Sequence, residues 1–386
     1  MYQIPYGRQD ISEEDIRAVV EVLRSDWLTQ GPTIERFEQS VAEYCGTKYA
    51  VAVNSATSAL HIACMAAALG AGDSLWTSPN TFVASANCGI YCGAKVDFVD
   101  IDEKTYNMSS VKLAEKLSSK RIGYKIPKVV IPVHFSGQSC TMEDISKLSE
   151  EYGFTVIEDA SHAIGGSYKN LKIGSCRYSD MAVFSFHPVK IITTGEGGMI
   201  VTNRQDLYEK LLRLRSHGIT RNPEYMVGDS EGPWYYQQVE LGYNYRMTDL
   251  QAALGLSQLT RIDKFIEMRN ALAERYNQKL KGIPGIVIPW QHLDCYSAWH
   301  LYVIQIKSSS KSRLQVFEKL RQYGIGVNVH YIPVHTQPYF RQLGFCHGDF
   351  PISEQYYEST ISLPLYYTLT EAQQDYIVDA LRKALE

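Results

Sequence analysis

Short apolar runs alternate with helical patterns through the middle of the sequence, and this alternation restricts the possible fold more than any other feature. A parallel pair of strands needs a long crossover connection, usually a helix, so such sheets carry helices on both faces. The alternation therefore predicts an α/β fold with a mainly parallel sheet. Strands are expected at 49–54, 74–78, 95–100, 129–133, 155–159, 181–186 and 199–201, and helices from 55–58 to near 70, around 79–87, and at 109–119 and 142–152.

The length of 386 residues exceeds one ordinary core, so a large and a smaller domain are expected. A helix capped by Thr248 is expected to run to about Lys281, with the domain boundary inside or just after it. This gives an N-terminal segment with the large domain at 1–265 and a smaller C-terminal α/β domain at 266–386. Other helices are expected at 10–24 (N-cap Ser12), from Thr33 as N-cap to 44, at 204–216 and at 312–323, with strand segments at 299–306 and 326–331.

The composition disfavours several classes of protein. The formal net charge of −4 offers no overall basic surface for nucleic acid. No run of about 18 apolar residues suits a membrane span, and the first residues lack a signal-peptide pattern. The eight cysteines are scattered, and the Cys88 and Cys92 pair fits helix packing better than a metal site. We therefore expect a cytoplasmic protein with reduced thiols, no metal, and no nucleic-acid or membrane partner.

The segment Ser55–Ser58 follows a predicted strand and opens a helix rich in Ala and Leu. Backbone N–H groups and the helix dipole bind phosphate at such a helix start. Ser and Thr are equally common there as ordinary N-caps, and the local sequence favours neither interpretation. No G-x-G-x-x-G or G-x4-G-K-[ST] pattern is present, which removes the main support for a dinucleotide or nucleoside triphosphate site.

Three further residues fit a cofactor that has a flat ring and an aldehyde. Asp159 ends an apolar strand, where a carboxylate needs a cation or several donors. Phe82 precedes a helix and is placed to stack on a ring, although a lone aromatic is more often core. Lys190 lies between the turn at His187-Pro188 and the glycine-rich loop 194–198, at the edge where α/β sheets place catalytic side chains. Pyridoxal phosphate uses this set: a lysine for its aldehyde, a carboxylate for its ring nitrogen and a helix start for its phosphate.

Two irregular segments remain. The stretch 218–243 is rich in Gly, Pro and Tyr and is long for a loop, which favours a functional or interfacial role. The link 26–32 carries an aromatic residue and several hydrogen-bonding groups, and is as compatible with a plain connector between helices as with a binding segment.

Four motifs together are specific enough to identify a resemblance. They are Glu158-Asp-Ala-Ser-His162, Ser185-Phe-His-Pro-Val-Lys190, Thr194-Gly-Glu-Gly-Gly198 and Gly242-Tyr-Asn-Tyr-Arg-Met-Thr-Asp249. With Trp27-Leu-Thr-Gln-Gly-Pro32, they make essentially the whole chain resemble the sugar aminotransferases of the DegT/DnrJ/EryC1/StrS family. The opening Ile4-Pro-Tyr-Gly-Arg8 and the His-Pro-Val-Lys form are most similar to the members that act in pseudaminic acid synthesis.

The resemblance implies a fold type I aminotransferase that uses pyridoxal phosphate and works as a homodimer with shared active sites. Lys190 would bond the cofactor and then act as a base, and Asp159 would hold the pyridine nitrogen. His162 would contact the ring hydroxyl, and Phe82 would stack on the ring. The phosphate would be bound by Ala56, Thr57 and Ser185, with Asn244 supplied by the neighbouring subunit. The nucleotide-sugar pocket would be lined by Tyr6, Asp26, Trp27, Leu28, Thr29, Asn328, Val329, His330 and Tyr331.

The expected reaction moves an amino group from L-glutamate to C4 of a UDP-linked 4-keto-6-deoxy-N-acetyl-hexose. Other nucleotide keto sugars stay open, namely those that lead to perosamine, 4-amino-arabinose or a 3-amino sugar. A catalytically silent regulatory protein that binds pyridoxal phosphate is the alternative from another class, and the joint presence of Lys190, Asp159 and Ser185 argues against it. Family members with His in place of the lysine act as dehydratases, so Lys190 favours transamination.

Overall fold

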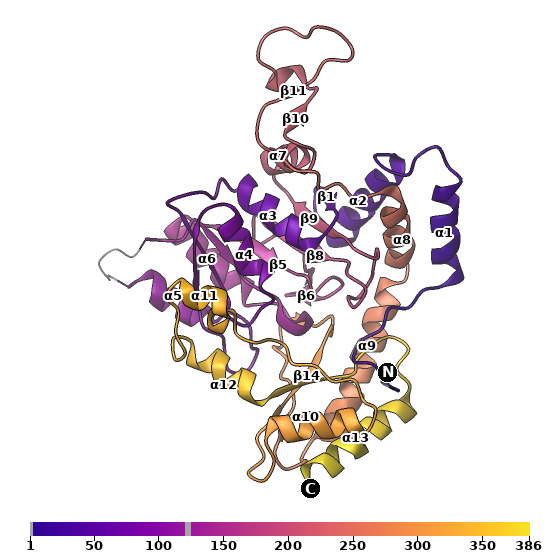
Figure 1. Ribbon diagram of the computed structural model, residues 1–386, viewed down its shortest axis with the longest axis vertical. Coiled ribbons are helices and arrows are strands. Elements are labelled where there is room, and N and C mark those ends of the chain that lie inside the picture. The colour runs from indigo at the N-terminus through magenta and orange to yellow at the C-terminus, as the bar shows by residue number, and fades with distance from the viewer. Residues whose placement is uncertain (1–2, 120–124) are drawn as a thin grey trace.

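The computed structural model describes residues 3–119 and 125–386, and a seven-stranded sheet lies at the centre of this part of the chain (Figure 1). Its strand order is β1-β9-β8-β5-β4-β2-β3. β9 runs antiparallel to both of its neighbours, whereas the other neighbouring pairs are parallel, so the predicted α/β fold with a mainly parallel sheet is confirmed. The strands are β1 (Tyr49–Val53), β2 (Ser74–Thr77), β3 (Lys95–Phe98), β4 (Val129–Ile131), β5 (Thr155–Asp159), β8 (Met181–Ser185) and β9 (Gly198–Thr202).

Helices cover both faces of this sheet, and further helices pack in the C-terminal part of the chain (Figure 1). Within the described ranges, no helix combines the length and apolar character that a membrane span requires. In chain order the helices are α1 (Glu13–Leu23), α2 (Pro32–Cys45), α3 (Ala56–Ala66), α4 (Ala84–Tyr91), α5 (Ser110–Leu117), α6 (Met142–Tyr152), α7 (Gln205–Arg215), α8 (Asp249–Leu259), α9 (Ile262–Leu280), α10 (Arg313–Gln322), α11 (Pro338–Gln342), α12 (Pro351–Ser359) and α13 (Glu371–Leu385). Three 3-10 turns are η1 (Phe135–Gly137), η2 (Pro223–Tyr225) and η3 (Val334–Thr336). The short strands outside the large sheet are β6 (Ser167–Tyr168), β7 (Leu171–Lys172), β10 (Ile219–Thr220), β11 (Gln237–Gln238), β12 (Ile286–Val287), β13 (Cys295–Tyr296), β14 (Tyr302–Ile306) and β15 (Thr360–Leu363).

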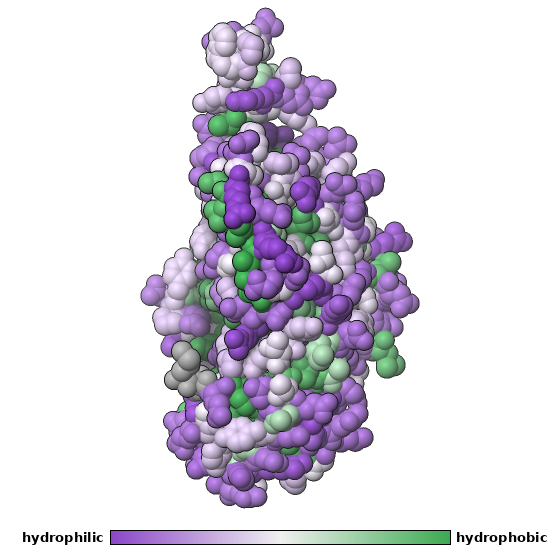
Figure 2. Space-filling model, turned by 90° about the vertical axis from the view of Figure 1, so that its right-hand side faces the viewer, coloured by the Kyte–Doolittle hydropathy of each residue, from purple (hydrophilic) through white to green (hydrophobic). Residues whose placement is uncertain are grey.

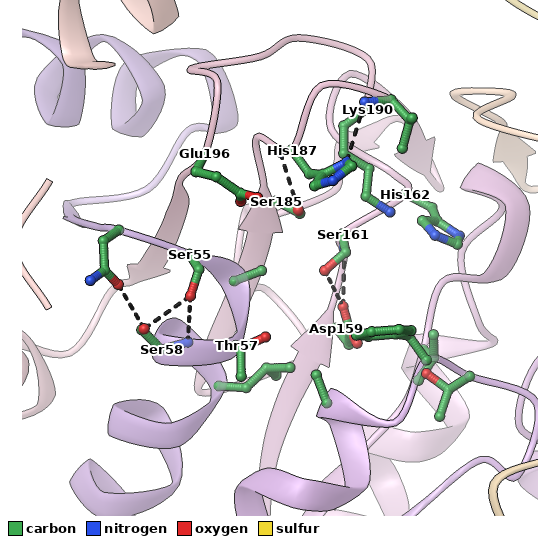
Figure 3. A pocket seen from close by; sticks show the side chains of 18 of the residues that line it. Ser55, Thr57, Ser58, Asp159, Ser161, His162, Ser185, His187, Lys190 and Glu196 are labelled. Carbon is green, nitrogen blue, oxygen red and sulfur yellow. Dashed lines mark hydrogen bonds between the residues drawn. The ribbon is translucent and has the colours of Figure 1, made fainter. Parts of the chain in front are cut away.

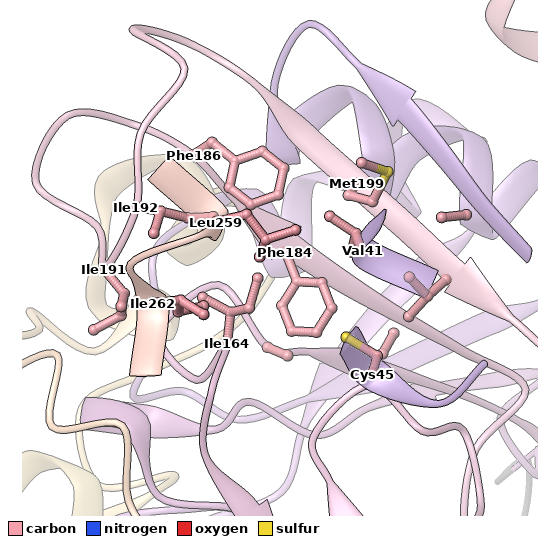
Figure 4. Packing of buried hydrophobic residues seen from close by; sticks show 14 of the residues in the cluster. Val41, Cys45, Ile164, Phe184, Phe186, Ile191, Ile192, Met199, Leu259 and Ile262 are labelled. Atoms are coloured by element: carbon pink, nitrogen blue, oxygen red, sulfur yellow. The ribbon is translucent and has the colours of Figure 1, made fainter. Parts of the chain in front are cut away.

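The two faces of the large sheet pack against different helices because successive residues of a strand point to opposite sides. Phe184 and Met199 pack against α2 and Leu259 of α8, as Figure 4 shows. Their strand neighbours Val183 and Ile200 pack on the other face, in a cluster with α3 and α7. Every residue of β8 and β9 is buried, which is why both strands appear in the sequence as continuous apolar runs.

Three predictions of local structure are wrong. The N-cap of α2 is Gly31 and not Thr33. The backbone N–H groups of Gly31 and Thr33 donate to the Asp249 carboxylate at 2.8 and 3.0 Å. The helix capped by Thr248 does not run on, since α8 ends at Leu259 and α9 begins at Ile262. The segment 326–331 forms no strand; Asn328 pairs with Ser362 of β15 through an isolated bridge, and Nδ1 of His330 lies 2.7 Å from the Ser362 hydroxyl oxygen.

A second apolar core lies in the C-terminal part of the chain. There β14 pairs with β12 and β15 in a small antiparallel sheet that packs against α10 and α13. Along α9, Phe265 is buried in the core of the large sheet, whereas Leu272 is buried in the second core. Ile4, near the N-terminus, also packs into the second core. Because the two cores meet along α9, we propose that the boundary between the predicted domains 1–265 and 266–386 lies in this helix.

An arm formed by residues 217–243 projects from the large domain and makes up the narrow upper end of the molecule (Figures 1 and 2). Its only regular pairing in the described structure is the two-residue ladder between β10 and β11. Val227, Trp234 and Leu241 on this arm are more than two-thirds exposed. Exposed apolar side chains of this kind often mark a surface that contacts another molecule. An interfacial role for the arm stays a prediction.

Candidate active site

A cavity of about 780 Å³ opens at the carboxyl ends of the central strands (Figure 3). Asp159 ends β5, Ser185 ends β8, and Asn54 directly follows β1. Ligands of open α/β sheets bind at this edge. The structure thus brings most of the predicted cofactor residues together, because the cavity is lined by Ala56, Thr57, Phe82, Asp159, His162, Ser185 and Lys190.

One end of the cavity is the first turn of α3. Ser55 is the N-cap, and its side-chain oxygen accepts from the backbone N–H of Ser58 at 3.1 Å. The Ser55 carbonyl accepts from the backbone N–H of Ala59 at 3.0 Å. Within the described residues, this pattern leaves the N–H groups of Ala56 and Thr57 free for a ligand. The serine cap is therefore confirmed. The free N–H groups of Ala56 and Thr57 are compatible with the phosphate-binding interpretation, which stays a prediction.

The glycine-rich loop beside this turn needs its glycines for two different reasons. Gly195 has φ +80°, a conformation that side chains rarely adopt. Gly198 has an ordinary φ, but a Cβ there would lie 2.6 Å from the backbone N of Ala56. Gly198 therefore allows β9 to approach the first turn of α3, and a larger residue would displace the strand or the helix start.

The Asp159 carboxylate is held in one orientation by three donors. Its Oδ1 accepts from the backbone N–H and the hydroxyl of Ser161 at 3.1 and 2.6 Å, and its Oδ2 accepts from the Ser85 hydroxyl at 2.6 Å. Ser85 lies on α4 and also hydrogen-bonds Thr81 at 2.7 Å. Each carboxylate oxygen has lone pairs to spare, so a protonated ring nitrogen in the cavity could be a further donor. This fixed acceptor is the arrangement that a pyridinium needs.

Lys190 extends toward the space between His162 and Asp159 (Figure 3). Burial lowers the pKa of Lys190 to about 8, and the negative charge of Asp159 opposes part of that shift. A larger fraction of the amine is therefore neutral near pH 7 than in an exposed lysine. A neutral amine is the form that attacks an aldehyde and accepts a proton.

The ring-binding part of the cavity is completed by aromatic side chains. Phe82 lines the cavity and leaves 58% of its surface exposed, so a face is free for stacking. Tyr331 also lines the cavity, with its ring centroid 6.4 Å from that of Phe82. His162 is almost fully buried, and both of its ring nitrogens already have partners. The expected direct contact between His162 and a ring hydroxyl stays untested, but it would require one of these partners to move.

The residues expected to bind the nucleotide sugar fall into two groups. Tyr331 lines the cavity, and His330 lies next to it, with its ring 5.9 Å from that of Tyr6 and its Nε2 3.5 Å from the amide of Asn328. Val329 follows in the same segment and is half-buried. The segment Asp26 to Thr29 is exposed and does not line the cavity, although the carbonyl of Leu28 accepts from the N–H of Asp249 at 3.0 Å. Gln251, in the same helical turn as Asp249, does line the cavity.

Asn244 does not line the cavity of its own chain. It is exposed at the base of the arm, where it forms a bridge with Ser216. This position is compatible with the prediction that Asn244 serves a neighbouring subunit, and it does not test it.

Sequence reasoning missed several residues of the site. Neither Ser161 nor Ser85 was predicted to be a site residue, yet both orient the Asp159 carboxylate. Glu196 and Gln251 line the mouth of the cavity and are joined by a hydrogen bond of 2.8 Å from the Gln251 amide to the Glu196 carbonyl. A serine two residues after a strand-end aspartate is a recognisable turn signal, whereas no local pattern connects Ser85 with Asp159. In the described ranges, no group of three or more His, Cys, Asp or Glu residues is arranged to hold a metal ion.

Comparison with known proteins agrees with this geometry. The DegT/DnrJ/EryC1/StrS aminotransferase family matches residues 9–382. The chain is 42% identical to the spore coat polysaccharide biosynthesis protein SpsC of Bacillus subtilis over 98% of this chain and 96% of that protein. It is 35% identical to a UDP-4-amino-4,6-dideoxy-N-acetyl-beta-L-altrosamine transaminase of Campylobacter jejuni, over 99% and 98% of the two chains.

A solved structure extends the match to three dimensions. Helicobacter pylori PseC, an aminotransferase involved in the biosynthesis of pseudoaminic acid, superposes with a TM-score of 0.89 at 32% identity, covering 99% of each chain. The donor set described above fits pyridoxal phosphate, which the aminotransferases of this family use. Lys190, Asp159, the first turn of α3 and Phe82 would hold its aldehyde, ring nitrogen, phosphate and ring face. The chain belongs to the DegT/DnrJ/EryC1/StrS family and is a sugar aminotransferase that depends on pyridoxal phosphate.

Proposed function

We propose that this enzyme transfers the amino group of L-glutamate to C4 of a UDP-linked 4-keto-6-deoxy-N-acetyl-hexose. The product is UDP-4-amino-4,6-dideoxy-N-acetyl-β-L-altrosamine, an intermediate of pseudaminic acid biosynthesis. Support comes from the names of the Campylobacter and Helicobacter relatives. The polysaccharide role of the Bacillus relative names no sugar, so another nucleotide keto sugar is the second candidate.

The observation that carries the aminotransferase chemistry is a lysine, a fixed carboxylate and a helix start with two free N–H groups that line one cavity. Bound pyridoxal phosphate supplies an electron sink for the carbon that exchanges its amino group. Lys190 holds the cofactor and moves the proton between carbon centres, for which a pKa of about 8 suits a general base near neutral pH. Asp159 keeps the ring nitrogen protonated, and the N–H groups of Ala56 and Thr57 bind the phosphate.

The sugar-binding part of the proposal rests on the group formed by Tyr6, Asn328, His330 and Tyr331. Burial raises the pKa of Tyr6 and lowers that of His330 to about 3, so both side chains stay neutral near pH 7. Neutral hydroxyl, amide and imidazole groups suit the uncharged hydroxyl and acetamido substituents of a sugar. The segment Asp26 to Thr29 would close the rim through its contact with the first turn of α8.

We also propose a two-fold homodimer in which Asn244 completes the phosphate site of the partner. Exposure of Asn244 at the base of a projecting arm supports this arrangement. A two-fold interface is self-complementary, so one patch around Asn244 would serve both sites.

The test is a panel of nucleotide 4-keto sugars with L-glutamate as amino donor. The UDP sugar with an acetamido group should exceed GDP- and dTDP-linked sugars without it in kcat/KM, by up to about 10⁴-fold, because buried polar groups reject an analogue that leaves them unpaired. Lys190→Arg is the matched control, since it keeps a cation but removes the reactive amine. An equal or reversed preference between these nucleotide sugars would exclude the proposed sugar but not the aminotransferase activity. Cofactor binding without turnover of any keto sugar would favour a silent regulatory protein.

A further inference from the structure

A hydrogen-bond chain from Ser136 through His162 to Tyr331 has one possible polarity. The backbone N–H of Ser136 donates to Nδ1 of His162 at 3.3 Å, and Nε2 of His162 lies 3.1 Å from the Tyr331 hydroxyl oxygen. A backbone N–H can only donate, so Nδ1 must be the unprotonated nitrogen. In neutral histidine the hydrogen is then on Nε2, which donates to Tyr331. The hydrogen of the Tyr331 hydroxyl is therefore not used in this bond.

The start of this hydrogen-bond chain is held in place by residues 298–301, which precede β14. The Ser136 hydroxyl donates to the carbonyl of Leu301 at 2.6 Å, and the N–H of Leu301 donates back to the Ser136 carbonyl at 3.3 Å. The carbonyl of Gly137 accepts from Ala298 at 3.0 Å. Gly137 has φ +106°, and a Cβ there would lie 2.7 Å from the backbone N of Trp299. The donor that fixes the His162 tautomer therefore cannot turn away without breaking several bonds.

His162, in the middle of this hydrogen-bond chain, stays neutral near pH 7. His162 is 5% exposed, and the His300 ring packs beside it with centroids 4.4 Å apart. Burial, with a further contribution from the positive charge of Lys190, keeps the pKa of His162 well below its usual value. Burial and the charge of Asp159 raise the pKa of Tyr331, so its hydroxyl keeps its hydrogen.

We propose that Tyr331 donates a hydrogen bond to an oxygen atom of a molecule bound in the cavity, and that His162 is the positioning residue that fixes the direction of this bond. Tyr331 lines the cavity, whereas both nitrogens of His162 are occupied. The acceptor is a phenolic or carbonyl oxygen, which either the ring of the cofactor or the keto group of the sugar can supply. The proposal rests on the aminotransferase site and does not depend on which sugar is aminated.

The tautomer can be read without turnover. Cofactor-free protein labelled with ¹⁵N-histidine is studied by NMR, and the His162 signals are assigned by their disappearance in His162→Gln. We expect Nδ1 without hydrogen, Nε2 with hydrogen, and no protonation of this ring across neutral pH. A hydrogen on Nδ1 or an imidazolium at neutral pH would overturn the polarity.

Three variants test the donated bond. Tyr331→Phe and His162→Leu should each weaken the contact with the bound oxygen by about 10- to 100-fold, the range expected for a hydrogen bond to a charged or strongly polarised group. His162→Gln should recover most of the contact that is lost in His162→Leu, because its amide oxygen can accept from Ser136 while its NH₂ group donates to Tyr331. If His162→Gln is as impaired as His162→Leu, the positioning role is wrong.

Two measurements on these variants identify the acceptor. In the loaded enzyme without substrate, a shifted pH midpoint of the cofactor absorption band in Tyr331→Phe assigns the ring oxygen. The keto oxygen is the acceptor if Tyr331→Phe leaves the midpoint and the half-reaction with the amino donor unchanged and lowers kcat/KM for the keto sugar. If Tyr331→Phe changes neither the midpoint of the absorption band nor kcat/KM for the keto sugar, the proposal is overturned. A wrong sugar assignment would instead appear as poor turnover by the wild type, while the NMR result and the absorption titration would be unaffected.

Discussion

The pKa of Lys190 in the cofactor-free enzyme offers a quantitative test of the site. The structure places this pKa at about 8, because burial disfavours the charged amine more than the neighbouring Asp159 carboxylate favours it. At pH 8 about half of Lys190 would be neutral, whereas a lysine with the ordinary pKa of about 10.4 would be neutral to only about 0.4%. The neutral fraction of Lys190 would therefore be about 100-fold larger.

The assay is competitive labelling of the cofactor-free enzyme with a trace of an amine-specific acylating reagent across a range of pH. Peptide mass spectrometry follows Lys190 and, as an internal control, Lys169. A hydrogen bond from Lys169 to Glu143 raises the pKa of Lys169. Labelling of Lys190 should rise about tenfold per pH unit below pH 8 and then level off, while labelling of Lys169 should continue to rise past pH 10.

A variant separates the two causes of the shift. Asp159→Asn removes the negative charge that raises the pKa of Lys190, so the midpoint of Lys190 should move further below 8. The midpoint of Lys169 should not change. A Lys190 midpoint equal to that of Lys169, or an upward shift in Asp159→Asn, would refute the argument that burial sets the charge of this amine.

Three further predictions concern catalysis, assembly and stability. In the holoenzyme, Asp159→Asn should still bind cofactor but lose about 10²-fold or more in turnover, because the electron sink is weakened; near-normal kcat would contradict its role. Lys190→Ala mixed with Asn244→Ala should regain activity after subunit exchange, because one site of each mixed dimer has both residues intact; no recovery despite demonstrated exchange would exclude an Asn244 contribution across the interface. Asp249→Ala should lower the urea midpoint, with a loss of about 2 kcal/mol or more, because two backbone N–H groups of the Gly31–Thr33 segment lose their buried acceptor. An unchanged midpoint would mean that water or another group replaces this carboxylate.

The sequence predicted those parts of the fold that depend on neighbouring residues. The strands of the large sheet follow from apolar runs, and the N-caps at Ser12 and Thr248 follow from the residue types at the helix starts; the structure contains both. The break between α8 and α9 has no such signal. Arg261, at the break, bonds Asp10 and Asp15 at 2.7 and 2.6 Å, and these partners are about 250 residues away in sequence.

In the candidate site, too, the sequence predicted only what depends on neighbouring residues. The helix start capped by Ser55 and the strand-end position of Asp159 were predictable, because each follows from a strand and the residues next to it. The Ser85 hydroxyl that orients Asp159 and the Ser136 N–H that fixes His162 come from other elements. Such contacts are set by how the elements pack, and a single sequence carries no local pattern for them.

Borohydride reduction can identify the lysine that bonds the cofactor. The purified protein is loaded with pyridoxal phosphate, reduced with borohydride, digested and mapped by mass spectrometry, with Lys190→Ala as the control. We expect a pyridoxyl group on Lys190 in the wild type and none at a defined position in the variant. A pyridoxyl group on another lysine, or equal labelling of both proteins, would contradict this expectation.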